Sequence, residues 1–308
     1  MTAAKKKKKA ASSTLNLREM LTWSHERPWA FWSGATLMAV LLFSTTTYFV
    51  WQGVRHNVLA GDDYMVARDS IRITPVPQWL EGIAREETIR DEVYRGMAID
   101  GPLSLMNEDL TERIYNSFSL HPWIAAVKRV AKQHPGTIRV ELQYRRPVAM
   151  VPTPEGPIPI DPMGIQLPRG GFSMDAATRD YLQVRLIGGS TKPLGMEGER
   201  WGDPRIADAA AIAAVLVDTW KRWGLRQIEL SSRTPARMPN YPAYDLVTHG
   251  GSRIRWGRPP GINIQGEATT AEKLSWIEEH FADHGTLEGN GGTQVLEIPV
   301  GRLSARAR

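Results

Sequence analysis

The strongest constraint in this chain is a run of 21 residues, 30–50, that carries no formal charge. As a helix it would rise about 31 Å, close to the thickness of the hydrocarbon core of a bilayer. Trp29 and Trp32 lie at one end, and Tyr48 and Trp51 lie at the other, as in the aromatic belts at membrane interfaces. A buried core helix is the alternative, but a core helix of this length normally keeps a polar face. We therefore predict that this run crosses a membrane.

A charge imbalance separates the two sides of this run. Residues 1–29 contain seven Lys or Arg and two Glu, a net charge of +5, which is also the net charge of the whole chain. Residues 51–308 are therefore formally neutral. The positive-inside rule then places the basic tail in the cytoplasm and the large C-terminal part outside it. The residues that carry this topology signal are Lys5, Lys6, Lys7, Lys8 and Lys9.

Other interpretations of the N-terminal region are weaker. The lysines can also lie on the anionic inner leaflet of the membrane. A nucleic-acid tail is disfavoured because the neutral remainder of the chain offers no basic face to continue onto. A cleaved signal peptide is disfavoured because the apolar run is too long and no small-residue cleavage site follows it. The chain has no cysteine, which excludes disulfides, a thiolate nucleophile and cysteine-ligated metal.

The region from 70 to 148 has the periodicity of an α+β domain. We expect, in order, a strand at 70–74, a helix at 80–94 that stops near Gly96, a helix after an N-cap at Asn107, and strands at 123–130 and 137–144 around a turn at 133–136. Apolar and polar residues alternate cleanly over 137–144, as they do in a half-buried antiparallel hairpin. Leu110, Ile114 and Phe118 fall at four-residue spacing on one face of the second helix. The order strand, helix, helix, strand, strand follows.

The second part of the chain begins with a stretch, 150–171, whose prolines and glycines exclude a long helix. Within it, residues 161–164 have the Asp-x-x-Gly pattern of a turn. Beyond it we expect a strand at 181–187, an amphipathic helix at 204–220, a strand at 226–230, a hairpin of strands at 244–248 and 253–256, a helix opened by a capping box at 269–272, and a last strand at 294–300.

Three motifs give the first of these regions a resemblance to a known domain. The motifs are HPWIAAVKR at 121–129, HPGTIRV at 134–140 and YRRPVA at 144–149. Together with the element order they resemble the POTRA domain of the bacterial cell-division proteins FtsQ and DivIB. The residues of the motifs, or of the core that the resemblance implies, are Trp123, Arg129, Tyr144, Arg146 and Pro147.

The second region resembles the β domain of FtsQ. It carries Leu-x-x-x-Gly-Gly-x-x-Ile-x-Trp-Gly at 246–257 and then VLEI at 295–298. One departure is that Glu297-Ile298-Pro299 stands where the family usually has Asp-Leu-Arg. Pro299 lacks the backbone N–H that a ladder hydrogen bond requires.

The resemblance implies an α+β protein with one N-terminal transmembrane helix, a POTRA domain and a mixed β domain with two helices. The expected segments are a basic tail at 1–29, the transmembrane helix at 30–54, a linker at 55–69, the POTRA domain at 70–149, the β domain at 150–300 and a loose tail at 301–308. It also implies a single-pass protein of the bacterial inner membrane whose C-terminal domains are periplasmic. As a scaffold of the division machinery at the septum, it would bind other bitopic proteins, FtsB-like and FtsL-like, and an FtsK-like protein.

The last strand is the expected partner site. An edge strand leaves half of its backbone groups unpaired, and a partner can pair with them by strand addition. The residues concerned are Gln294, Val295, Leu296, Glu297, Ile298 and Val300. The alternative is that Pro299 and the basic tail after it merely block this edge.

The sequence contains no pattern typical of an active site. His280 and His284 are four apart on a predicted helix, but no third metal ligand is apparent, and exposed helix-end histidines are the simpler interpretation. We expect no enzyme activity, cofactor, metal, nucleic acid or small-molecule substrate. Two alternatives remain open: a POTRA-containing envelope adaptor for protein transport or assembly, and a membrane-anchored enzyme.

Overall fold

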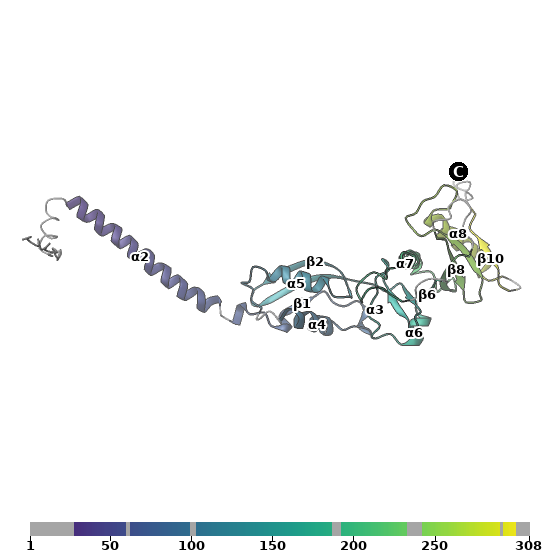
Figure 1. Ribbon diagram of the computed structural model, residues 1–308, viewed down its shortest axis with the longest axis horizontal. Helices are drawn as coiled ribbons and strands as arrows, with labels where there is room; N and C mark the ends of the chain where they lie inside the picture. The colour runs from purple at the N-terminus through teal and green to yellow at the C-terminus, as the bar shows by residue number, and fades with distance from the viewer. Residues whose placement is uncertain are drawn as a thin grey trace, which may run out of the picture. The chain divides into compact units, whose positions relative to one another are not determined.

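The computed structural model of the chain is shown in Figure 1. The structure describes residues 28–59, 62–98, 103–186, 192–232, 242–289 and 292–299. Lys5 to Lys9, Val300 and the tail at 301–308 lie outside the described residues. The chain divides into two compact units, Met1–Asp62 and Asp63–Arg308.

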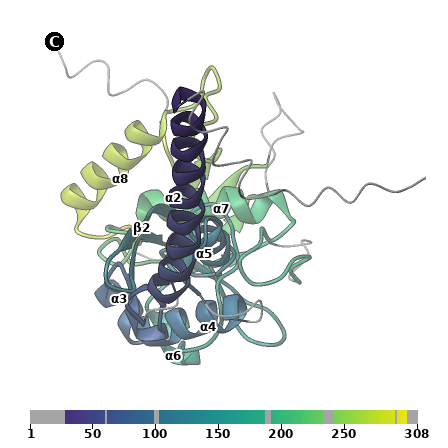
Figure 2. The same cartoon turned by 90° about the vertical axis from the view of Figure 1, so that its left-hand side faces the viewer.

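The first unit contains one long helix, α2 (Pro28–Leu59), which is uninterrupted in both views (Figures 1 and 2). Its stretch Gly34–Val54 is long and apolar enough to cross a membrane, and none of it is buried. A core helix would be buried. The helix extends past both ends of the uncharged run: it begins at Pro28 and continues through residues 51–59.

The second unit begins with a three-stranded sheet of β1 (Ile71–Ile73), β2 (Ile124–Gln133) and β3 (Thr137–Tyr144), in the order β1-β3-β2. The hairpin of β2 and β3 is antiparallel, as predicted, and β1 joins β3 in parallel. Ile138, Val140 and Leu142 are buried, while the residues between them are exposed. The alternation in the sequence therefore corresponds to one core face and one solvent face.

Three helices cover the core of this first domain: α3 (Gln78–Glu81), α4 (Glu86–Ala98) and α5 (Leu110–Ser119). The single helix predicted at 80–94 is wrong, because the chain turns between α3 and α4 and this turn packs Ile83 and Ala84 against the core. Gly96 lies inside α4 and does not stop it.

The start of α5 also differs from the prediction. The helix begins at Leu110, and the residue at its N-cap position is Asp109, not Asn107. Asn107 precedes this N-cap, and its carbonyl accepts a hydrogen bond from the Leu110 N–H at 3.3 Å. The predicted apolar face of Leu110, Ile114 and Phe118 is confirmed, since all three are fully buried.

The segment expected as a linker at 55–69 is structured at both ends. Its first residues continue α2 to Leu59. Two 3-10 turns, η1 (Asp62–Tyr64) and η2 (Arg68–Ser70), bracket Met65, which bridges to Ser104, and the buried Val66. Its last residues therefore belong to the first domain.

The second domain is built on a seven-stranded sheet in the order β10-β9-β8-β7-β6-β4-β5. Its strands are β4 (Ala149–Val151), β5 (Ile158–Ile160), β6 (Leu182–Arg185), β7 (Leu225–Leu230), β8 (Tyr244–Thr248), β9 (Arg253–Gly257) and β10 (Val295–Glu297). The hairpin of β8 and β9 is confirmed. The stretch at 150–171 contains short strands and turns, and no long helix among its residues.

The helices of this domain are α6 (Met174–Arg179), α7 (Pro204–Leu216) and α8 (Thr270–His284). The predicted helix at 204–220 is too long, because turns replace it after Leu216 and carry Trp220 and Trp223 into the core. The short α6 adds a helix to the two that were predicted. The capping box at α8 is confirmed, with Thr269 and Glu272 bonded reciprocally.

Two features join the first domain to the second. Asp161 accepts backbone hydrogen bonds from Met163 and Ile165 and pairs with Arg145 at 2.8 Å. Leu167 and Phe172, from the second domain, pack in the core of the first. The two domains therefore share packing across the boundary predicted near residue 149.

Candidate partner-binding edge

The outermost strand of the seven-stranded sheet is β10, drawn in yellow in Figure 1. It runs parallel to β9, with Leu296 opposite Ile254. The Arg253 N–H donates to the Gln294 carbonyl at 2.8 Å, and the Gln294 N–H donates to Ser252 Oγ at 3.1 Å. Within the described residues, β10 has a strand on one side only, so no strand of those residues pairs with its outer side.

The two faces of β10 differ in character. Leu296 and the following Ile298 are partly buried and pack against the core cluster of the second domain. Val295 and Glu297 point to the opposite face, and the Val295 side chain is 54% exposed. Pro299 follows the end of the strand, so its missing N–H removes no hydrogen bond from the ladder of β10.

Charged side chains form a continuous row on the face that carries Glu297. Arg253 Nη1 lies 2.7 Å from Glu229 Oε2. Arg255 contacts Asp245 and Glu297, each at 3.7 Å. The acids on β7 and β8 are buried, whereas the Glu297 side chain is 71% exposed. This charge ladder, defined as Glu229, Asp245, Arg253, Arg255 and Glu297, holds three carboxylates for two guanidinium groups and ends in a carboxylate at the free edge.

The connection before β10 is fixed by hydrogen bonds. Glu288 accepts from the Gly250 N–H at 2.8 Å, at the turn of the β8–β9 hairpin. Burial acts to raise the pKa of Glu288, but hydrogen bonds from Thr248, Ser252 and Gly250 outweigh it and lower that pKa. The Gln294 side chain also donates to the Leu287 carbonyl at 3.3 Å. These contacts set where β10 starts.

The helix before this connection is anchored by a buried charge. Lys273 of α8 is only 3% exposed and lies 2.6 Å from Glu267. Its ammonium also lies 5.3 Å from the centre of the Trp256 ring on β9, a favourable cation–π contact. α8 is thereby tied to the strand that pairs with β10.

The residues expected from the resemblance lie away from this edge, in the first domain and at its junction with the second. Trp123 is 3% exposed and packs in the first core, and the Tyr144 hydroxyl donates to the Thr74 carbonyl at 2.5 Å. Burial raises the pKa of Tyr144, so the hydroxyl remains a donor. Arg129 and Arg146 are exposed, and Pro147 is buried.

The two histidines predicted to be four apart on a helix both lie on α8. The His280 and His284 rings stack at 4.2 Å, and His284 Nδ1 lies 2.9 Å from the His280 carbonyl. Burial, and then the neighbouring His284, lower the pKa of His280. Among the described residues, no three His, Asp or Glu side chains are grouped so that they could hold a metal ion.

The charge ladder was not predicted from the sequence. A signal for it exists, because each of the strands concerned carries a charged residue at the positions that alternate with its apolar ones. The order of strands in the sheet, which the sequence does not state, is needed to bring those residues together.

No protein-family model matches the chain, and no curated protein is similar to it at a significant level.

Proposed function

We propose that this protein is a non-catalytic, single-pass membrane scaffold of the bacterial division machinery that recruits other bitopic membrane proteins by strand addition at β10. The observation that carries the proposal is the unpaired edge of β10, a strand held in register by β9 and ending in an exposed carboxylate. The partners would be FtsB-like and FtsL-like proteins, with an FtsK-like protein as a further one. The division role rests on the resemblance of the sequence to FtsQ and its POTRA domain.

The membrane part of the proposal is supported by α2 and by the charge distribution. Gly34–Val54 has the length and composition of a membrane span. Lys5 to Lys9 precede it, and the chain after it is formally neutral. The proposed orientation has the N-terminus in the cytoplasm and the two domains in the periplasm, on the outer side of the inner membrane.

The charge ladder defines what the added strand should look like. A strand paired with β10 would place one residue beside Glu297 and the next beside Leu296. Because the ladder ends in the exposed carboxylate of Glu297, a Lys or Arg of the added strand beside Glu297 would form a favourable cross-strand pair of opposite charge. An apolar residue beside Leu296 would extend the core face.

The binding test uses the full chain, purified from its own cells in mild detergent, with bound membrane proteins identified by mass spectrometry. We expect Leu296→Pro to abolish co-purification of one or more bitopic proteins, because proline removes a donor and bends the strand. Glu297→Lys should weaken the binding of the same partners. Glu279→Lys, at an exposed position of α8, should leave their binding unchanged. Retention of every partner by Leu296→Pro, with circular dichroism unchanged, would place the binding surface elsewhere.

The division role needs a separate test. Cells depleted of the protein should grow into filaments without septa, and the intact gene should restore septation. Depleted cells that divide normally but lose outer-envelope proteins would instead favour the transport or assembly adaptor.

A further inference from the structure

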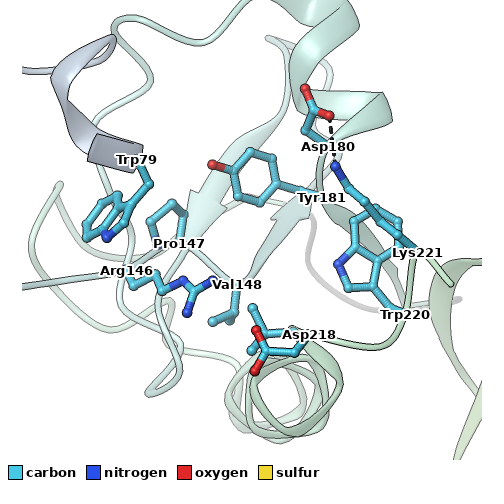
Figure 3. A pocket seen from close by; sticks show the side chains of 10 residues that line it. Trp79, Arg146, Pro147, Val148, Asp180, Tyr181, Asp218, Trp220 and Lys221 are labelled. Carbon is cyan, nitrogen blue, oxygen red and sulfur yellow. Dashed lines mark hydrogen bonds and ion pairs between the residues drawn. The ribbon is translucent and has the colours of Figure 1, made fainter. Parts of the chain in front are cut away.

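A hollow of about 430 Å³ lies at the junction of the first and second domains (Figure 3). Trp79 of α3 and Arg146, just after β3, form one side of it, and Tyr181, just before β6, lies across from them. Asp218 and Trp220, in the turns after α7, complete it. Its volume falls within the range of about 300–1,000 Å³ of typical ligand pockets, and none of these residues belongs to the β10 edge.

Three hydrogen-bond donors line this hollow, two of them on half-buried aromatic side chains and one on an exposed arginine. They are the Trp79 indole N–H, the Arg146 guanidinium and the Tyr181 hydroxyl. Within the described part of the chain, none of these groups forms a hydrogen bond or an ion pair, and Figure 3 shows the guanidinium pointing into the middle of the hollow. Burial and then the nearby Asp180 raise the pKa of Tyr181, while the Arg146 guanidinium opposes them without reversing the shift, so the hydroxyl keeps the proton that it can donate.

The acidic groups around the hollow are in two different states. Asp180 is paired with Lys221 at 3.0 Å, which lowers the pKa of Asp180. The Lys221 ammonium also lies 5.4 Å from the centre of the Trp220 ring, so its charge is already engaged. Asp218, by contrast, has no ion-pair partner in the described residues and faces the Arg146 guanidinium across the opening (Figure 3).

This arrangement selects the chemistry of a ligand. A free guanidinium between two other donors fits a carboxylate, which accepts a planar pair of N–H bonds from arginine. A bare anion such as phosphate would meet the carboxylates of Asp180 and Asp218. A ligand that carries its own N–H groups next to its carboxylate would instead give Asp218 a donor. The half-buried rings of Trp79 and Tyr181 add apolar surface beside which an apolar side chain can lie.

We infer that this hollow binds a peptide through a carboxylate, with Arg146 as the anchor, the Trp79 and Tyr181 rings against a neighbouring apolar side chain, and Asp218 accepting from a peptide N–H. The carboxylate can come from an acidic side chain or from a C-terminus. This site is separate from β10, so it would give the protein a second place to hold a partner.

The test uses the full chain in detergent, labelled with 5-fluorotryptophan and followed by fluorine NMR. The Trp79 signal is assigned by its loss in Trp79→Phe. Three N-acetylated tripeptides are titrated: acetyl-Phe-Asp-Phe-amide, its neutral counterpart acetyl-Phe-Asn-Phe-amide, and acetyl-Phe-Phe-Gly with a free C-terminal carboxylate. We expect saturable shifts of the Trp79 signal with at least one carboxylate peptide, and binding of the asparagine peptide weaker by roughly tenfold.

The variants decide whether Arg146 is the anchor. Arg146→Gln should reduce the affinity of the carboxylate peptide to that of the asparagine peptide, while the remaining tryptophan signals stay in place. Arg129→Gln, at an exposed position of β2, should bind the peptides as the unchanged protein does. Which of the two carboxylate peptides binds identifies the source of the group. The inference is overturned if neither carboxylate peptide shifts Trp79 at millimolar concentration, if the asparagine peptide binds equally well, or if Arg146→Gln has no effect.

Discussion

The hairpin of the first domain and the edge of the second are both β-structure, yet they differ in strand length and in the burial of their side chains. β2 and β3 are 10 and 8 residues long, and the inward side chains Ile138, Val140 and Leu142 are all buried. β10 has 3 residues, and Val295 is more than half exposed. A long strand with a buried face contributes to the stability of its domain. A short, exposed edge contributes little to stability but retains unpaired backbone groups for binding.

The largest effect that would test this difference comes from the core beside the hairpin. Trp123→Ala should lower the free energy of unfolding of the unit 63–308 by about 3–5 kcal/mol, because it leaves a cavity in a packed core. Lys128→Ala, exposed on β2, which begins directly after Trp123, is the control and should cost little. Thermal and urea unfolding measure both. Equal stability of the two variants would mean that the Trp123 side chain does not contribute to the stability of this core.

The next effect concerns the junction between the domains. Asp161→Ala removes an acceptor of two backbone N–H groups and leaves Arg145 without its partner. We expect a loss of about 2–4 kcal/mol, since both charges are largely buried. Asp175→Ala, an exposed residue of α6, serves as the matched control. A loss no greater than that of the control would show that the junction does not depend on this pair.

A smaller effect on stability is expected at the edge. Leu296→Glu should destabilise the unit by about 1–2 kcal/mol, because Leu296 packs partly against the core. Val295→Glu should change stability by less than about 0.5 kcal/mol, because that side chain is exposed. Urea unfolding of the two variants compares the faces of one strand. A greater loss with Val295→Glu would mean that the faces of β10 are assigned the wrong way round.

The smallest effect is a dependence on pH in the first domain. His121 is buried, its Nε2 lies 3.2 Å from Glu92, and its Nδ1 lies 3.3 Å from the Trp123 N–H. Burial lowers the pKa of His121 below its ordinary value of 6.5, although Glu92 opposes this. Below pH 6.5 the unfolded chain therefore binds a proton that the folded chain binds less readily, so this contribution to stability is present above pH 6.5 and declines as the pH falls.

The measurement is the urea midpoint of the unit 63–308 between pH 7.5 and pH 5. The midpoint should fall toward low pH, and His121→Asn should flatten part of this dependence. His134→Asn, at an exposed turn, should leave the dependence as it is. An unchanged slope in His121→Asn would show that His121 titrates normally in the folded protein.

How far the sequence predicts the structure depends on how local each feature is. Alternation at 137–144 and the spacing of Leu110, Ile114 and Phe118 predict correct strands, helices and buried faces, because each depends on near neighbours along the chain. The break between α3 and α4 was missed because tertiary packing of Ile83 outweighs the helical pattern. The helix predicted at 204–220 was too long for the same reason. The chain leaves the helical conformation after Leu216, and this allows Trp220 to be buried in the core.

The candidate sites show the same limit. The partner site was predicted on a last strand at 294–300. The structure places that strand at an edge of the sheet but limits it to Val295–Glu297. The charge ladder depends on the order of β7, β8, β9 and β10, and the hollow depends on bringing Trp79 next to Tyr181. Both arise from contacts between residues far apart in the sequence, which no local pattern encodes.

The packing of Leu167 and Phe172 in the first core has a consequence for how this protein can be recombined. A domain is usually exchanged between relatives as one continuous stretch of chain. Here, residues 70–149 moved into another host would arrive without two of the side chains that fill their own interior. The residues of the host protein at the positions of Leu167 and Phe172 would then have to fill the space in the core of the transferred domain. The unit of inheritance for the first domain is therefore discontinuous, and a viable chimaera must carry the loop at 167–172 together with the hairpin.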